Sequence, residues 1–316
     1  MAARIDPDRR TRTVAGNRGQ RVSSSRARAA RPVPLAVQAR GMSDRLVILT
    51  WHSVNVLGNH YADNDLIAFS EDLLLLDRLG WTILPLESGL QRLAKGDLPD
   101  RAVALTADDG SILDFDSFPH PTCGAQLGLL PRLRRLLVEQ RLDKRHEPVI
   151  SAFVIASPEA RAELDRKVTG GLDLWPDHWW REANGSGLMN IESHSWDHNH
   201  DVLEVTAQRA NRRGDFRAIE TEDECRIEVD QASAWIERLS GRRPRFFAYP
   251  YGQSSDYLRR DYLPARGAGL GLHAALSCEP APVSRSSERW HLPRYVCGRD
   301  WNSPEEFARL LADAST

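Results

Sequence analysis

Residues 101–110 read RAVALTADDG, an apolar run that stops abruptly at two adjacent carboxylates and a glycine. Such a run is typical of a buried β-strand, predicted here over 103–106. Neighbouring side chains on a strand face opposite ways, so Asp108 and Asp109 reach one cleft only if the chain turns there. Two close carboxylates repel unless a cation or a shared proton relieves them, so this pair is a candidate functional site. Taken alone, Asp-Gly also fits an ordinary β-turn.

Outward from this stretch, the chain alternates apolar strands with amphipathic helices from Arg45 onward. The predicted strands cover 46–51, 81–84, 103–106, 149–155, 189–193, 246–249 and 274–278, and the predicted helices 70–79, 86–93, 126–141, 158–168, 176–183 and 221–239. No linker of domain-separating length interrupts this alternation. Repeated βα units predict an α/β fold, either one parallel barrel or a doubly wound sheet.

The charge is unevenly distributed along the 316 residues. The net charge is −2, but residues 1–41 contain ten arginines and only two acids, so the remainder carries −10. An acidic body argues against a nucleic-acid partner. The four cysteines show no CxxC spacing, which favours reduced thiols over a disulfide framework or a zinc knuckle.

Residues 1–41 differ in composition from the rest of the chain. They are rich in Arg, Ser, Ala and Pro, which predicts a disordered tail, or a segment that precedes the true start at Met42. Residues 42–316 are then expected to form the folded domain. No apolar core of an export signal follows Arg9-Arg10, and no apolar run reaches membrane-spanning length. We therefore expect a cytoplasmic protein without a membrane partner.

A second constellation of polar residues is ESHSWDHNH, residues 192–200. His194 and His198 are four apart, a spacing that on one helical turn puts both imidazoles on the same face, as a single metal ion requires. A loop with hydrogen-bonding histidines is the alternative. The pair follows the predicted strand 189–193, and the carboxyl ends of parallel strands open on one rim, so the histidines and aspartates are expected to meet. His200 is expected to support the pair or to face solvent.

The third motif is FFAYPYG, residues 246–252, a predicted strand that breaks at proline and glycine. In this order, TADDG, HSWDH and FAYPYG resemble the polysaccharide deacetylase family, with its NodB-type catalytic domain (carbohydrate esterase family 4). The flanking segments LTWHSV (49–54), SAFVI (151–155) and HLPRY (291–295) resemble the same family. The resemblance covers about residues 45–300. It implies a distorted (β/α)7 barrel that removes N-acetyl groups from an amino-sugar poly- or oligosaccharide.

The resemblance also implies roles for individual residues. Asp109, His194 and His198 would hold one divalent metal ion, with zinc preferred over other transition metals. Asp108 would be the general base that takes a proton from the attacking water. The backbone N–H of Tyr251 would stabilise the oxyanion.

The chain departs from the family pattern at two places. Ala248 stands where many members have an arginine that orients the base, and Arg294 is the predicted substitute, since a guanidinium holds a carboxylate with two hydrogen bonds. The usual late histidine motif is also absent. His52 is therefore the first choice for the general acid that protonates the leaving amine, with His291 and His273 behind it.

Two other functions remain open from the sequence. The same barrel could hydrolyse a linear or cyclic amide that is not a sugar, which fits the absence of an export signal. A non-catalytic carbohydrate-binding protein is the third reading, and the complete set of two aspartates and two histidines argues against it. The oligomeric state is left open.

The segment 111–123 follows the aspartates directly and carries aromatic residues and two prolines. Loops at the carboxyl face of such barrels set specificity. We expect this segment to form a wall of the cleft, with Trp175, Trp179 and Trp180 adding bulk. An ordinary loop whose aromatics pack locally is the alternative.

Overall fold

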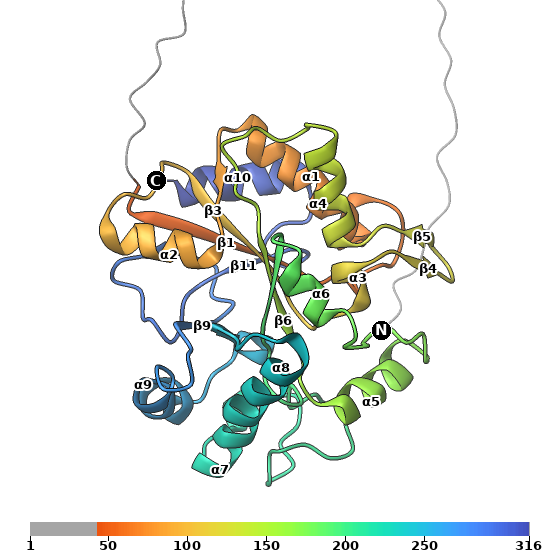
Figure 1. The fold of residues 1–316 in the computed structure, drawn as a ribbon, viewed down its shortest axis with the longest axis vertical. Helices are drawn as coiled ribbons and strands as arrows, with labels where there is room; N and C mark the ends of the chain where they lie inside the picture. The colour runs from red at the N-terminus through yellow and green to blue at the C-terminus, as the bar shows by residue number, and fades with distance from the viewer. Residues whose placement is uncertain (1–42, 316) are drawn as a thin grey trace, which may run out of the picture. The chain divides into compact units, whose positions relative to one another are not determined.

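Short apolar runs form the strands of one curled, mostly parallel sheet in the computed structural model, which describes residues 43–315 (Figure 1). Six parallel strands lie side by side in chain order: β1 (Arg45–Trp51), β3 (Ala102–Ala107), β6 (Ile150–Val154), β7 (Met189–Ser193), β8 (Phe246–Ala248) and β9 (Ala274–Leu276). Three short strands complete the sheet: β2 (Thr82–Ile83) beside β3, and β10 (Val283–Ser284) and β11 (Tyr295–Val296) beside β1. The predicted tail 1–41 and start at Met42 lie outside the described residues.

The segment 292–296 joins the two edges of the sheet. Leu292 bridges in parallel to Leu276 of β9, and Tyr295 pairs in parallel with Leu49 of β1. This segment acts as a seventh parallel element and curls the sheet toward a closed barrel. The predicted fold class, a distorted barrel of the NodB type, is confirmed.

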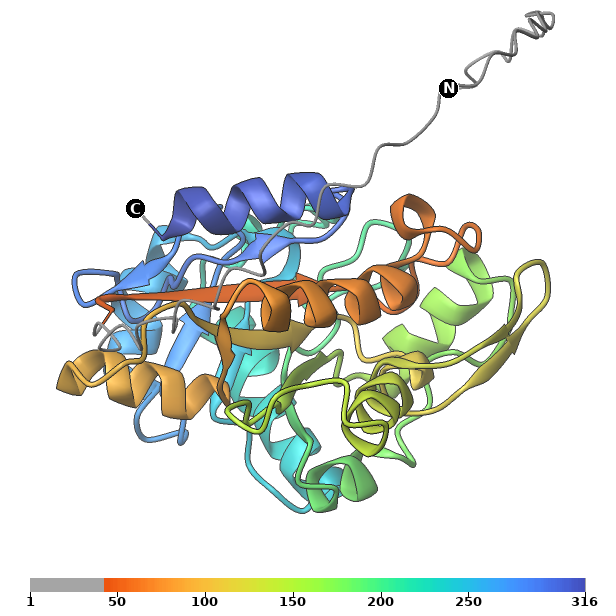
Figure 2. The same ribbon diagram turned by 90° about the horizontal axis from the view of Figure 1, so that it is seen from above.

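Helices cover the outside of the sheet. They are α1 (Asp65–Arg78), α2 (Leu86–Lys95), α4 (Leu129–Val138), α5 (Pro158–Val168), α6 (Trp180–Gly185), α7 (Glu222–Cys225) continued by the π-helical η3 (Arg226–Gln231) and α8 (Ala232–Ser240), the π-helical η5 (Tyr257–Tyr262) continued by α9 (Leu263–Arg266), and α10 (Pro304–Ala314). α1 and α10 pack together near β1 (Figure 2). Among the described residues, no helix is long and apolar enough to cross a membrane.

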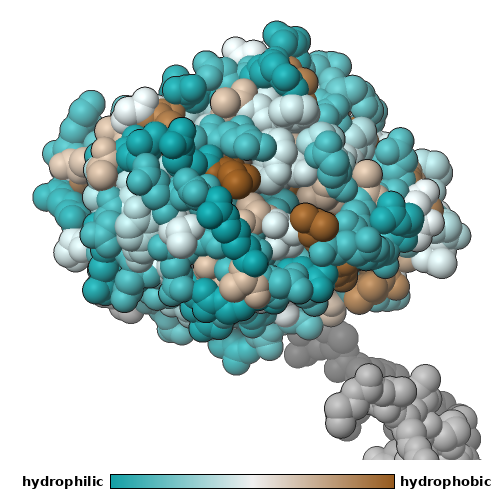
Figure 3. Space-filling model, turned by 90° about the horizontal axis from the view of Figure 1, so that it is seen from below, coloured by the Kyte–Doolittle hydropathy of each residue, from teal (hydrophilic) through white to brown (hydrophobic). Residues whose placement is uncertain are grey.

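Both faces of the central strands are buried, which explains why their sequences are continuously apolar. Side chains alternate along β1: Leu46 and Ile48 belong to one core cluster, and Val47 and Leu49 belong to the larger cluster that includes α1 and α4 residues. The outer surface is different in character. The face shown in Figure 3 is predominantly hydrophilic, and its hydrophobic residues lie separately.

Several predicted boundaries were wrong. α1 begins five residues before the predicted 70, because the Asn64 side chain accepts hydrogen bonds from the N–H groups of Leu66 and Ile67 and so caps the helix earlier. α6 begins at Trp180 instead of 176. The segment 111–123, for which no helix or strand was predicted, contains α3 (Ile112–Phe115) and β4 (Phe118–His120), which forms a hairpin with β5 (Gly124–Gln126). α10 was not predicted from the sequence.

Candidate active site

The two aspartates sit on a tight turn at the carboxyl end of β3. Asp109 and Gly110 both have φ of 75°, in the left-handed region, so the chain reverses direction immediately after the strand. A Cβ on Gly110 would lie 2.6 Å from a methyl carbon of Val154, so this position also needs glycine for space. The turn allows Asp108 and Asp109 to line the same cavity.

The histidine pair lies on a loop after β7, residues 194–200, which we call the histidine loop. The prediction that a helical turn brings the pair together was wrong. Instead, Ser195, His198 and Asn199 adopt left-handed conformations with φ of 71°, 65° and 44°. The N–H of His198 donates to Ser195 Oγ at 2.9 Å, and the two imidazole centroids lie 4.8 Å apart. The two imidazoles therefore lie close together, as predicted, but a strained loop and not a helical turn brings them there.

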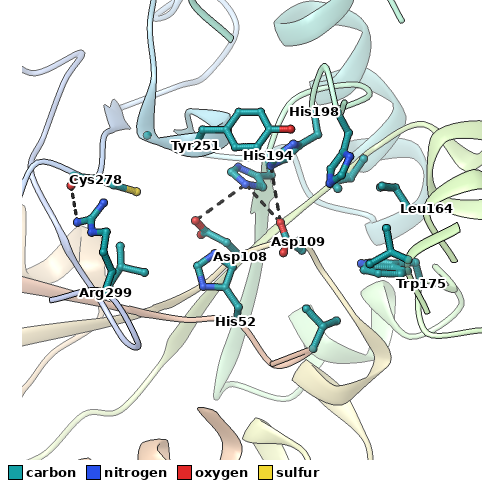
Figure 4. Close-up of a pocket in the computed structure, with 16 residues that line it drawn as sticks. His52, Asp108, Asp109, Leu164, Trp175, His194, His198, Tyr251, Cys278 and Arg299 are labelled. Carbon is teal, nitrogen blue, oxygen red and sulfur yellow. Dashed lines mark hydrogen bonds and ion pairs between the residues drawn. The ribbon is translucent and has the colours of Figure 1, made fainter. Parts of the chain in front are cut away.

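Asp109, His194 and His198 face one another across the cavity (Figure 4). Asp109 Oδ1 lies 3.6 Å from Nε2 of His194 and 3.8 Å from Nε2 of His198. His194 Nδ1 lies 2.8 Å from the carbonyl oxygen of Ala248, which can only accept, so Nδ1 carries the proton and Nε2 is free to bind. Burial, with the neighbouring histidines, lowers the pKa of His198 well below its usual value, which keeps this imidazole neutral. One carboxylate and two imidazoles are a donor set that suits a divalent transition metal with an open position.

Arg294 reaches Asp108 from the far end of the chain. Its Nη1 and Nη2 donate to the two carboxylate oxygens of Asp108 at 2.8 and 2.7 Å, and its Nε donates to the carbonyl of Ser277. Arg294 is fully buried and Asp108 is 3 % exposed. Burial alone would raise the pKa of Asp108, but the charge of Arg294 and its hydrogen bonds to the carboxylate outweigh it and lower the pKa to about 2. Asp108 is therefore ionised at neutral pH and held in one orientation.

His52 and Tyr251 line the same cavity. His52 follows β1, and its backbone N–H donates to Asp65 Oδ2 at 2.8 Å. Tyr251 has φ of 58°, and its ring lies 4.6 Å from the ring of His198. His200 also lines the cavity, with its Nδ1 2.9 Å from Asp201 Oδ1.

The two other histidines predicted as candidates for the general acid are elsewhere. His273 packs against Phe246 at 6.0 Å, close to the start of β8 and away from the carboxyl ends of the strands. His291 lies 5.8 Å from the ring of Tyr249. Neither residue lines the cavity, so only His52 of the three candidates is placed beside the aspartates.

The cavity has a volume of about 300 Å³ and two unlike sides (Figure 4). Trp175 and Leu164 lie on the side of Asp109 and His198, and Cys278 and Arg299 lie on the opposite side. Leu164, Cys278 and Arg299 also line the cavity, and none of the three was predicted from the sequence. Leu164 could have been found, because its predicted helix follows a strand that ends at the same rim.

The predicted wall made by residues 111–123 is not observed. This segment is described throughout, and none of its residues lines the cavity. Phe115 instead stacks against Trp179 at 5.6 Å, and both Trp179 and Trp180 are buried in the main core. Trp175 is the one member of the predicted tryptophan group that lines the cavity.

Residues 144–265 match the sequence model of the family described as polysaccharide deacetylase. The match includes the HSWDH and FAYPYG motifs, whereas TADDG and HLPRY lie outside it. No curated protein sequence matches the chain.

Solved structures share the fold over most of the chain. The structure of IcaB from Ammonifex degensii is 18 % identical, with a TM-score of 0.56, and the alignment covers 87 % of this chain and 99 % of that one. The Streptococcus pyogenes deacetylase PplD is 17 % identical, with a TM-score of 0.55 and coverage of 84 % and 98 %. The deacetylase domain of BpsB from Bordetella bronchiseptica is 16 % identical, with a TM-score of 0.52 and coverage of 82 % and 98 %. The sequence match over residues 144–265 agrees with the predicted resemblance to the polysaccharide deacetylase family, and the solved structures share the fold of the chain.

Proposed function

We propose that the chain is a metal-dependent hydrolase that removes N-acetyl groups from an amino-sugar poly- or oligosaccharide. The observation that carries the proposal is the cluster of Asp109, His194 and His198 in one cavity with the buried Asp108–Arg294 pair. The family match supports the reaction type, and the related fold of PplD was solved in complex with acetate, the product of such a reaction.

In the proposed mechanism, Asp109, His194 and His198 hold one divalent ion, with zinc preferred. Such an ion would lower the pKa of water and polarise the amide carbonyl. Asp108 accepts the proton of the attacking water, which adds to the carbonyl carbon. The backbone N–H of Tyr251 donates to the developing oxyanion. His52 donates a proton to the nitrogen as the C–N bond breaks, and acetate and a free amine leave.

Replacing His194 by alanine tests the metal ligands. We expect the parent protein, loaded with Zn²⁺ and dialysed, to retain about one ion per chain, and His194→Ala to retain far less, because a three-ligand site loses one of its donors. Elemental analysis measures the stoichiometry. His291→Ala is the matched control, a buried histidine that does not line the cavity, and should retain metal like the parent. Full metal in His194→Ala would contradict the ligand assignment.

The cavity lining favours a second candidate, hydrolysis of a non-sugar amide. Ile155, Leu164 and Val168 all line the cavity and bring no hydrogen-bonding side-chain group to it. Sugar hydroxyls placed against these side chains would lose their hydrogen bonds to water without replacement. An amide with an apolar acyl group larger than acetyl would instead bury its chain there.

A series of N-acyl amides of one amine distinguishes the two candidates. For the second candidate, each added methylene should raise kcat/KM about fourfold, from roughly 0.8 kcal/mol per buried CH₂. Val168→Asn, at the half-exposed end of α5, should remove this gain, and Val138→Asn, at the exposed end of α4, is the matched control. Fastest turnover of the acetyl compound contradicts the second candidate and supports the first. Binding of chitooligosaccharide without release of acetate or amine would indicate a carbohydrate-binding protein.

A further inference from the structure

The backbone of the histidine loop is strained, and the hydrogen bonds within the loop are too few to hold it in this conformation. Three of its seven residues, Ser195, His198 and Asn199, are non-glycine residues in left-handed conformations. Each such residue costs on the order of 1 kcal/mol and persists only where surrounding contacts enforce it. Hydrogen bonds within the loop are few: the N–H of His198 to Ser195 Oγ, and the N–H of Asn199 to Asp197 Oδ1. The loop therefore needs anchors from other elements.

The long helix beyond the loop supplies one anchor through Glu228. Its Oε2 accepts hydrogen bonds from the backbone N–H of Trp196 at 3.0 Å and, more weakly, from that of Asp197 at 3.4 Å. Glu228 is fully buried. In the described part of the chain, Glu228 is the only side chain outside the loop that accepts hydrogen bonds from backbone N–H groups of residues 194–200.

A π-helical segment places Glu228 at this point. The buried residues of the helix come in pairs spaced by four, at 224 and 225, 228 and 229, and 232 and 233. In a regular α-helix, steps of four drift by about 40° per step, and the wider turns of η3 offset this drift. Glu228 thus stays on the face that packs toward the loop.

The side chain of Asp197 also holds the backbone of the histidine loop and of the segment after it. Its two oxygens accept the N–H groups of Asn199 and Ala207, each at 2.7 Å. Burial and the nearby charge of Asp197 raise the pKa of Glu228 well above its usual value, so the pair does not place two full negative charges side by side. A neutral carboxyl in this position resembles the amide of glutamine in size and in its hydrogen-bonding groups.

We infer that Glu228 is a positioning residue for the proposed metal centre: it fixes the backbone at Trp196 and Asp197, and through it the direction of the His198 imidazole. The inference rests on the proposed metal ligands, because His198 must point at the same place as Asp109 and His194. Groups that orient metal ligands typically change metal affinity 10–100-fold when they are removed. Glu228 would orient His198 indirectly, through the peptide N–H groups of Trp196 and Asp197.

The test compares Zn²⁺ affinity, measured by competition with a chromophoric chelator, among variants of the full chain. Glu228→Leu leaves two N–H groups of the loop unpaired and should raise the Kd for Zn²⁺ about 10–100-fold. Glu228→Gln offers an amide oxygen to the same N–H groups and should stay within about threefold of the parent. Glu228→Asp withdraws the carboxyl by one methylene and should weaken binding measurably, which keeps the test available if the leucine variant does not fold.

The matched control is Glu224→Leu, one turn earlier on the same helix. Glu224 is also buried and accepts backbone N–H groups, those of Arg209, Glu220 and Thr221, but it accepts no hydrogen bond from the histidine loop. This variant should lower the melting temperature of the metal-free protein and leave the Kd for Zn²⁺ unchanged. Parent-like affinity in both Glu228→Leu and Glu228→Asp, or equal weakening in Glu224→Leu, would overturn the inference. A parent protein that binds no Zn²⁺ would contradict the proposed metal centre itself, and this inference with it.

Discussion

Replacing Asp108 by asparagine is expected to lower kcat by about 10²–10⁴-fold while the protein still binds its metal ion. The substitution keeps the size of the side chain but removes the negative charge that accepts the proton of the attacking water. Because Arg294 holds the pKa of Asp108 at about 2, the parent carboxylate is fully ionised at neutral pH, so the whole population loses this function in the variant. Steady-state kinetics and metal analysis of the same sample measure the two properties together.

The neighbouring aspartate serves as the comparison for this experiment. Asp109 Oδ1 lies within 3.8 Å of both histidine Nε2 atoms, whereas Asp108 makes two hydrogen bonds to Arg294. Asp109→Asn should therefore lose metal as well as activity. If Asp108→Asn loses metal and Asp109→Asn keeps it, the two roles are reversed.

The strands and the position of the aspartates could be predicted because both depend on local sequence. An apolar run that ends at Asp108 and Asp109 predicts a buried strand and its carboxyl end, and the end of a parallel strand defines the rim of the barrel. Arg294 is 186 residues from Asp108. Its contact with Asp108 could be suggested only from the chemistry of a guanidinium beside a carboxylate, because nothing in the local sequence links two residues so far apart.

The features that escaped prediction depend on tertiary context. The spacing of His194 and His198 fits a helical turn equally well, and only the surrounding contacts select the left-handed loop that is observed. The π-helical turn at Glu228 has no local sequence signal, since the predicted helix 221–239 reads as an ordinary amphipathic helix. The aromatic residues after the aspartates were placed at the cavity from sequence proximity, whereas Phe115 packs against Trp179 instead.

Removing Arg294 should have the largest effect on stability. Arg294→Met leaves the carboxylate of Asp108 buried without its cation, and breaking a buried pair in this way typically costs about 3–5 kcal/mol. We expect this loss in the free energy of unfolding of the metal-free protein at pH 7, measured by urea denaturation. A metal-free sample is needed because a bound cation would itself stabilise Asp108.

The loss should depend on pH in a direction set by the pKa of Asp108. In the parent, this pKa is about 2, below the usual value of 3.8, so the pair stabilises the fold above pH 3.8 and the contribution disappears as the pH falls through 2. In Arg294→Met, burial is no longer outweighed by the guanidinium and raises the pKa of Asp108, so the variant loses stability as the pH rises through that value. The difference between parent and variant should thus be smaller at pH 4 than at pH 7.

A double variant separates the lost ion pair from simple loss of packing. Asp108→Asn combined with Arg294→Met removes the unpaired charge, and should be more stable at pH 7 than Arg294→Met alone. Packing defects around residue 294 would remain in both proteins and cannot produce this recovery. If the double variant is no more stable, and the deficit of Arg294→Met is the same at pH 4 and pH 7, the charge of Asp108 is not what Arg294 stabilises. Recovery together with a smaller deficit at pH 4 would show that Arg294 stabilises the fold by compensating the buried charge of Asp108.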